Sequence, residues 1–145
     1  MNDMRTSIEN VLYDYVYYYD FGPMADVGKC FTEDGKITMA DGSTVTGRAN
    51  ISEAFVVRRE KTVFPPGSIV VHQVTNVHIT TVSETEAKVR SVFAFHVIND
   101  KAVTTIATVG DYLDTFVKDT DDAWRIKVRI HRTYGRTPLT PQPAS

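Results

Sequence analysis

The spacing of hydrophobic residues along this chain changes from a helical to an alternating period near Gly67. Before Gly67, apolar residues recur three or four positions apart, as in an amphipathic helix. After it, four long segments alternate and are separated by short polar turns, so we expect neighbouring strands to pair antiparallel. The composition agrees, because 46 of the 145 residues are Val, Ile or Thr and only three are Leu. β-Branched residues favour sheet over a helical bundle.

The first half predicts three helices and a short hairpin. Ser7 is the expected N-cap of the first helix, and Gly22-Pro23 ends it. Thr32-Glu33-Asp34-Gly35 predicts a turn. A second turn, at Asp41-Gly42, predicts a tight hairpin. The expected helices cover residues 7–20, 24–31 and 48–61, and the hairpin strands cover residues 36–40 and 43–46.

The second half predicts a meander of four strands. Their expected ranges are 69–82, 86–98, 103–118 and 123–134. Helices followed by strands indicate an α+β fold, in which the helices leave a concave apolar site against a curved sheet. We expect one domain over residues 1–134 and a loose tail over residues 135–145, which contains three prolines.

Charge and motif content exclude several functions. The net charge of -2 and the absence of a polybasic segment argue against nucleic-acid and membrane partners. No apolar signal core opens the chain, so we expect a cytoplasmic protein. Cys30 is the only cysteine, and the histidines lack ligand spacing, so we predict no metal. The chain has no glycine-rich phosphate loop, and we therefore predict no cofactor.

Several short motifs occur in a characteristic order: Tyr19-Asp20, Cys30 to Gly35, Gly47-Arg48-Ala49-Asn50-Ile51, His72-Gln73-Val74-Thr75-Asn76, Gly110-Asp111-Tyr112, and Trp124-Arg125-Ile126 with Arg129. Over residues 7–134 this order resembles the SnoaL-like group of the cystatin-like α+β cone (nuclear-transport-factor-like) superfamily. The resemblance implies three N-terminal helices on the concave face of a strongly curved, mainly antiparallel sheet. The group includes polyketide cyclases, scytalone dehydratase and hexachlorocyclohexane dehydrochlorinase, but the fold also serves binding and assembly.

The resemblance implies a catalytic dyad of Asp20 and His72. A carboxylate that holds one imidazole nitrogen fixes the tautomer and stabilises the imidazolium. The other ring nitrogen can then remove a proton near neutral pH. The alternative is that Asp20 only ends the helix and that His72 is a half-buried strand residue.

Tyr19 and His96 are the further catalytic candidates, because both resemble pocket residues of scytalone dehydratase. A phenol can hydrogen-bond a carbonyl oxygen and stabilise an enolate. His96 lies in the apolar stretch Val92–His96, where a histidine needs a partner or a cavity. It faces either the pocket or an oligomer contact on the outer sheet face.

We expect substrate binding by four residues: Tyr15, Phe55, Phe95 and Arg129. The likeness to the dehydrochlorinase implies that Arg129 faces the leaving group. Strict alternation puts Arg129 on one strand face with His131 and two other basic residues, and that face is alternatively solvated or an interface. We expect exposed positions for His78 and His131, and surface or subunit contacts for Asp111 and Asp114.

The main hypothesis is a cofactor-independent lyase of the dehydratase type, acting on a small, mostly apolar cyclic substrate. The same acid and base could serve an isomerase or a polyketide-type cyclase. A non-catalytic ligand-binding or assembly subunit is the alternative from another class. Both faces of the long strands have apolar content, so a homo-oligomer, a trimer or a dimer, is expected.

Overall fold

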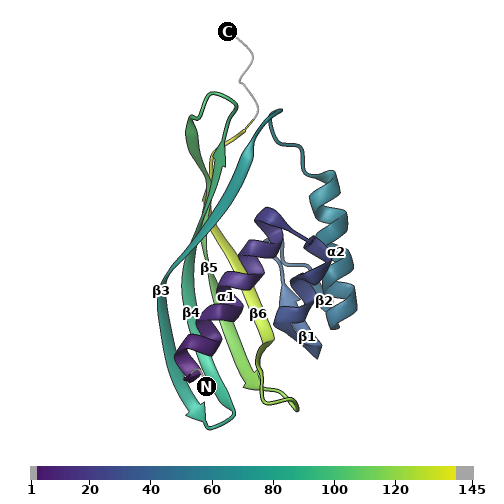
Figure 1. Cartoon of the computed structure of the whole chain (residues 1–145), viewed down its shortest axis with the longest axis vertical. Coiled ribbons are helices and arrows are strands. Elements are labelled where there is room, and N and C mark those ends of the chain that lie inside the picture. Colours follow the sequence, from purple (N-terminus) through teal and green to yellow (C-terminus); the bar gives the residue numbers. More distant parts are fainter. Residues whose placement is uncertain (1–2, 140–145) are drawn as a thin grey trace.

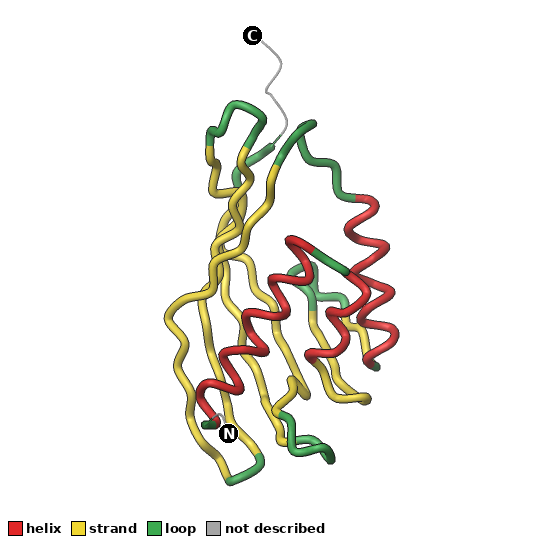
Figure 2. Tube along the Cα trace, viewed as in Figure 1, coloured by secondary structure: helices red, strands yellow, loops and turns green. Residues whose placement is uncertain are grey.

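The computed structural model describes residues 3–139, in which helices cover the concave face of one curved sheet (Figures 1 and 2). The helices are α1 (Met4–Phe21), the 3-10 helix η1 (Met24–Cys30) and α2 (Arg48–Lys61). The strands are β1 (Phe31–Thr38), β2 (Thr44–Thr46), β3 (Ile69–Ser83), β4 (Glu86–Ile98), β5 (Thr104–Lys118) and β6 (Trp124–Arg136). Within residues 3–139, no helix has the length and apolar character needed to cross a membrane.

The six strands lie in the order β2-β1-β6-β5-β4-β3. Strands β3 to β6 form the antiparallel meander predicted from the alternating pattern. Strand β1 adds parallel to β6, and β2 pairs antiparallel with β1. Figure 1 shows α1 crossing in front of the long strands, with α2 beside β1 and β2. The predicted α+β cone with its helices on the concave face is confirmed.

Helix α1 begins three residues before the predicted start at residue 7. The N-cap is Asp3 and not Ser7, because the Asp3 side chain accepts a hydrogen bond from the Thr6 backbone N–H at 2.7 Å. The helix ends as predicted at Gly22, whose φ of 80° favours glycine. The backbone N–H of Gly22 donates to the carbonyl of Tyr18, which closes the last turn beside Asp20.

The predicted turn at Thr32–Gly35 is instead an irregular part of β1. Phe31 lies opposite Ile126 and Lys36 opposite Val128, so β1 carries additional residues against β6. The Thr32 hydroxyl donates to Asp34 Oδ1 at 2.9 Å, as polar turn residues do. Local turn chemistry thus produces a bulge within the strand, because strand pairing continues on both sides of it.

Bulges also interrupt the long strands and bend the sheet. Asn76 in β3 has a φ of 55°, a conformation that asparagine tolerates better than most residues. In β6, Lys127 and Tyr134 are each an extra residue without a partner opposite it in β5. The strict alternation predicted for β6 is therefore wrong, because each bulge shifts the following side chains by one position.

The core lies between the helices and the inner sheet face. Its main cluster joins Ile8, Leu12 and Tyr15 of α1 to the inward residues of α2 and the sheet. A second, smaller cluster contains Val70, Phe95, Val97 and Ala107, with Phe64 and Leu139 packed against it.

Ordered structure continues beyond residue 134, the predicted end of the domain. Strand β6 continues to Arg136, and the Thr137 N–H donates to the carbonyl of Ala107 at 2.8 Å. Leu139 is partly buried against the second cluster. The first residues of the expected tail thus contact the sheet, and the rest of that tail, residues 140–145, lies outside the described residues.

Candidate active site

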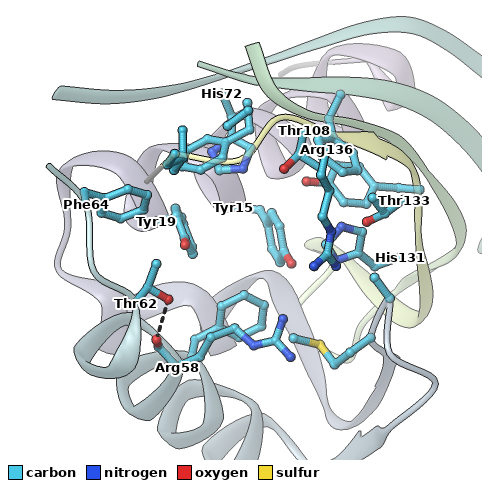
Figure 3. A pocket seen from close by; sticks show the side chains of 18 of the residues that line it. Tyr15, Tyr19, Arg58, Thr62, Phe64, His72, Thr108, His131, Thr133 and Arg136 are labelled. Carbon is cyan, nitrogen blue, oxygen red and sulfur yellow. Dashed lines mark hydrogen bonds between the residues drawn. The ribbon is translucent and has the colours of Figure 1, made fainter. Parts of the chain in front are cut away.

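A cavity of about 440 Å³ contacts both core clusters. Its wall combines aromatic and aliphatic side chains with threonines, histidines and arginines (Figure 3). The aromatic lining residues are Tyr15, Tyr19, Phe55, Phe64, Phe93, Phe95 and Tyr112. A concave apolar site of this size, with a few polar groups, suits a small organic molecule.

Asp20 and His72 meet at the edge of this cavity. Asp20 Oδ1 lies 2.6 Å from His72 Nδ1, and Asp20 Oδ2 accepts the backbone N–H of His72 at 2.6 Å. The side chain of Asp20 is 2% exposed and that of His72 is 11% exposed. One carboxylate therefore holds both the backbone and the ring of His72. Because Nδ1 is engaged by a hydrogen-bond acceptor, it carries the proton, and Nε2 is left available.

Local structure explains why these two residues meet. Asp20 lies in the last turn of α1, just before Gly22 ends the helix. His72 lies on β3 opposite Phe95 of β4, where side chains point to the concave face. The ring of His72 stacks on Phe95 at 4.4 Å and meets the edge of Tyr19 at 5.0 Å. The aromatic contacts fix the plane of the imidazole.

The two tyrosines predicted for the site both line the cavity. Burial raises the pKa of Tyr15 to about 12, although the Arg129 charge opposes the shift. Burial also raises the pKa of Tyr19. Both phenols therefore stay protonated at neutral pH and can donate a hydrogen bond to a ligand oxygen. Phe55 and Phe95, predicted to bind substrate, line the cavity as well.

Arg129 lies behind the cavity wall and does not face a ligand. Its Nε and Nη2 atoms each donate to Asp114 at 2.8 Å, and both side chains are fully buried. The guanidinium lies 4.3 Å from the ring centroid of Tyr15 and 3.9 Å from that of Tyr112. The predicted substrate contact of Arg129 and the predicted surface position of Asp114 are thus wrong. The bulge at Lys127 turns Arg129 inward, against Asp114.

His96 lies on the outer face of the sheet. Its Nε2 is 2.9 Å from Gln73 Oε1, and its neighbours in β4, Phe95 and Val97, are the residues that point inward. The pocket alternative for His96 is therefore wrong. Alternation places a residue next to Phe95 on the opposite face, and Gln73 is the polar partner that this histidine needed.

His131 lines the cavity, although the sequence predicted it to be exposed. The bulge at Lys127 puts it on the inner face with Arg129, and its ring packs edge-on against Phe93 at 5.0 Å. Arg58, Thr108, Thr133 and Arg136 are further polar lining residues that sequence analysis missed. No local signal marks a bulge in β6. Only the pairing with β5 shows which face each residue takes.

His131 is expected to make stability depend on pH. Burial, together with the positive charges of Arg129, Arg58 and Arg136, lowers its pKa to about 4. The unfolded chain takes up this proton near the ordinary value of 6.5, whereas the folded protein takes it up only near 4. Stability present above the unfolded pKa is therefore lost as the pH falls through this window.

The measurement is a pH series of urea unfolding for wild type and His131→Gln. We expect the wild type to lose more stability than the variant as the pH falls from about 6.5 to about 4. A difference between the two proteins that is the same at every pH would contradict a buried, neutral His131.

The fold and cavity define the class of the protein. A strongly curved sheet with helices on its concave face and a cavity between them is an α+β cone. The chain belongs to the SnoaL-like domain family, whose model matches residues 3–130. The predicted family is therefore confirmed. It is a family of small-molecule-binding proteins that includes cyclases and dehydratases.

Solved structures agree with this fold. A Novosphingobium aromaticivorans protein provisionally named a scytalone dehydratase has 28% identity and a TM-score of 0.71, over 97% of this chain and 94% of that chain. A Nostoc punctiforme protein described as having a cystatin-like fold has 18% identity and a TM-score of 0.75, with coverages of 94% and 95%. The β subunit of a dioxygenase, also from N. aromaticivorans and assigned provisionally, has 15% identity and a TM-score of 0.71, with coverages of 91% and 90%. No curated protein matches the sequence.

Within residues 3–139, no three His, Cys, Asp or Glu side chains are grouped as metal ligands would be. The buried side chain of Asp20 contacts His72, that of Asp114 contacts Arg129, and that of Asp111 contacts Arg132 and Tyr134.

Proposed function

We propose that the protein is a cofactor-independent lyase of the dehydratase type, in which His72 removes a proton from a small cyclic substrate. The observation that carries this proposal is the contact between Asp20 and His72 at the cavity edge. The carboxylate holds Nδ1–H and would stabilise the imidazolium that forms when Nε2 accepts a proton. The proposal rests on this geometry and on the family.

The proposed reaction needs no oxidant or reductant. Nε2 of His72 takes a proton from a carbon next to a carbonyl, and the C–H electron pair forms the enolate. Tyr19 or Tyr15 donates a hydrogen bond to the enolate oxygen. The electron pair then returns to form the carbon–carbon double bond as the neighbouring hydroxyl leaves. The imidazolium gives its proton to that hydroxyl, which departs as water.

The same acid and base would serve an isomerase or a cyclase, because the substrate decides which bond forms or breaks. A purely assembling subunit has no need of a carboxylate that holds a histidine at the edge of a cavity. The contact between Asp20 and His72 therefore favours chemistry over assembly.

The first experiment measures proton abstraction itself, which is common to all of these reactions whatever group leaves afterwards. A panel of cyclic ketones and hydroxyketones is incubated with the protein in deuterium oxide, and exchange next to the carbonyl is followed by NMR. We expect exchange or water loss for at least one compound with the wild type and neither with His72→Gln. Equal rates for the two proteins on every compound would contradict the role of His72.

A further inference from the structure

The permanently charged side chains among the described lining residues are all positive. Arg58 of α2 and Arg136 of β6 line the cavity, and no Asp or Glu is among the described lining residues. The whole chain, in contrast, has a net charge of -2. Cationic side chains gathered at a cavity whose described lining has no carboxylate favour a ligand with negative charge.

Neither arginine is neutralised by a close carboxylate. Arg58 approaches Asp41 only at 3.7 Å, and Asp41 is 61% exposed, so this pair is weak. For Arg136, no ion pair occurs within residues 3–139. Arg129 differs, because Asp114 satisfies its charge below the wall. Arg58 and Arg136 therefore keep the capacity to pair with a bound anion.

His131 adds an unmet hydrogen-bonding requirement at the same wall. Both of its ring nitrogens are buried without a hydrogen-bond partner among the described residues. Buried polar atoms are normally paired, and leaving one unpaired is costly. Figure 3 shows His131 and Arg136 in the lining of the cavity that also contains His72 and Arg58. A ligand oxygen at this wall would accept the N–H of the neutral imidazole.

We propose that His131, Arg58 and Arg136 form an anion subsite, which binds an anionic oxygen of a ring-bearing ligand. This inference rests on the proposed function in taking the cavity as the substrate site. In this subsite the two arginines pair with the negative charge of the ligand, and the neutral ring of His131 donates a hydrogen bond to its oxygen. The aromatic side chains of the wall contact the ring of the ligand. The same subsite would stabilise the oxygen of an enolate formed by His72.

The test compares naphthoate with naphthamide, which have the same ring system and differ in the charge of the oxygen-bearing group. Affinities are measured by calorimetry or by NMR titration near neutral pH. We expect naphthoate to bind at least about tenfold more tightly, because hydrogen bonds to charged groups are stronger than neutral ones.

The variants separate the two parts of the subsite. Arg58→Gln combined with Arg136→Gln should abolish the preference for naphthoate. His131→Phe should weaken both ligands, because the carboxylate and the amide carbonyl each accept an N–H. Arg90→Gln is the matched control, because it removes one positive charge from the exposed outer face of β4 and should leave the preference intact.

Failure of this inference is distinguishable from failure of the proposed function. Asp20→Asn should remove proton abstraction and leave the preference for naphthoate unchanged. Absence of naphthoate binding, equal affinity for both ligands, or a preference that survives in the double arginine variant would each overturn the anion subsite.

Discussion

Replacing Asp114 by asparagine is expected to lower the free energy of unfolding by about 3–5 kcal/mol, because the charge of Arg129 is then buried without a counter-charge. The two side chains are fully buried and joined by two hydrogen bonds of 2.8 Å. For a domain of this size, the melting temperature should fall by about 10–20 °C. Thermal and urea unfolding measure both quantities.

Two further variants make this result specific. Asp121→Asn breaks a comparable two-bond contact with Arg125, but at an exposed turn, so we expect a far smaller loss. Asp114→Leu combined with Arg129→Met replaces the pair by apolar groups and should recover most of the lost stability. An Asp114→Asn variant as stable as the wild type would show that the pair is not required for folding.

Asp20→Asn is expected to lower kcat/KM by about 100- to 10,000-fold on the substrate found in the exchange panel. Asparagine cannot stabilise the imidazolium of His72, and its NH2 group would replace one of the two carboxylate oxygens that accept hydrogen bonds from His72, so one of these bonds is lost. Steady-state kinetics measures the loss. NMR of the His72 ring proton would show whether the Nδ1–H tautomer is lost with it.

The matched control for this variant is Asp14→Asn, in the same helix but on its exposed side. It changes the same functional group without touching His72, so turnover should be retained. Full activity in Asp20→Asn, or an equal loss in Asp14→Asn, would contradict a specific role for the carboxylate of Asp20.

Much of the architecture could be predicted from the sequence where a single period runs without interruption. Helix α2 and strand β4 have the predicted bounds, because each has one clear pattern and polar or glycine residues at its ends. The contact of Asp20 with His72 was implied by resemblance to a known family, and no local pattern could have shown it. Fifty-two residues separate the two side chains.

Most of the wrong predictions concern residues that follow a bulge, where one strand has an extra residue. Arg129 and His131 were misplaced because the alternation of β6 reverses at Lys127, and only the register against β5 reveals this. Asp114 was predicted to make a surface or subunit contact, and only the register of β5 and β6 shows that it lies opposite Arg129. For His96 the sequence left both sheet faces open, and the structure shows the outer face, as alternation with Phe95 and Val97 requires.

The bulge at Lys127 has a consequence for how this scaffold can diversify. Lys127 is exposed, and it is one residue added to a strand. If β6 paired with β5 without this bulge and kept all of its residues, the two faces of the following segment would be exchanged, and Ile130 and Arg132 would replace Arg129 and His131 on the inner face. Deleting Lys127 itself would keep Arg129 and His131 on the inner face, because Ile126 and Val128 already lie opposite neighbouring residues of β5. One extra residue in β6 thus decides which side chains of this strand can approach the chamber.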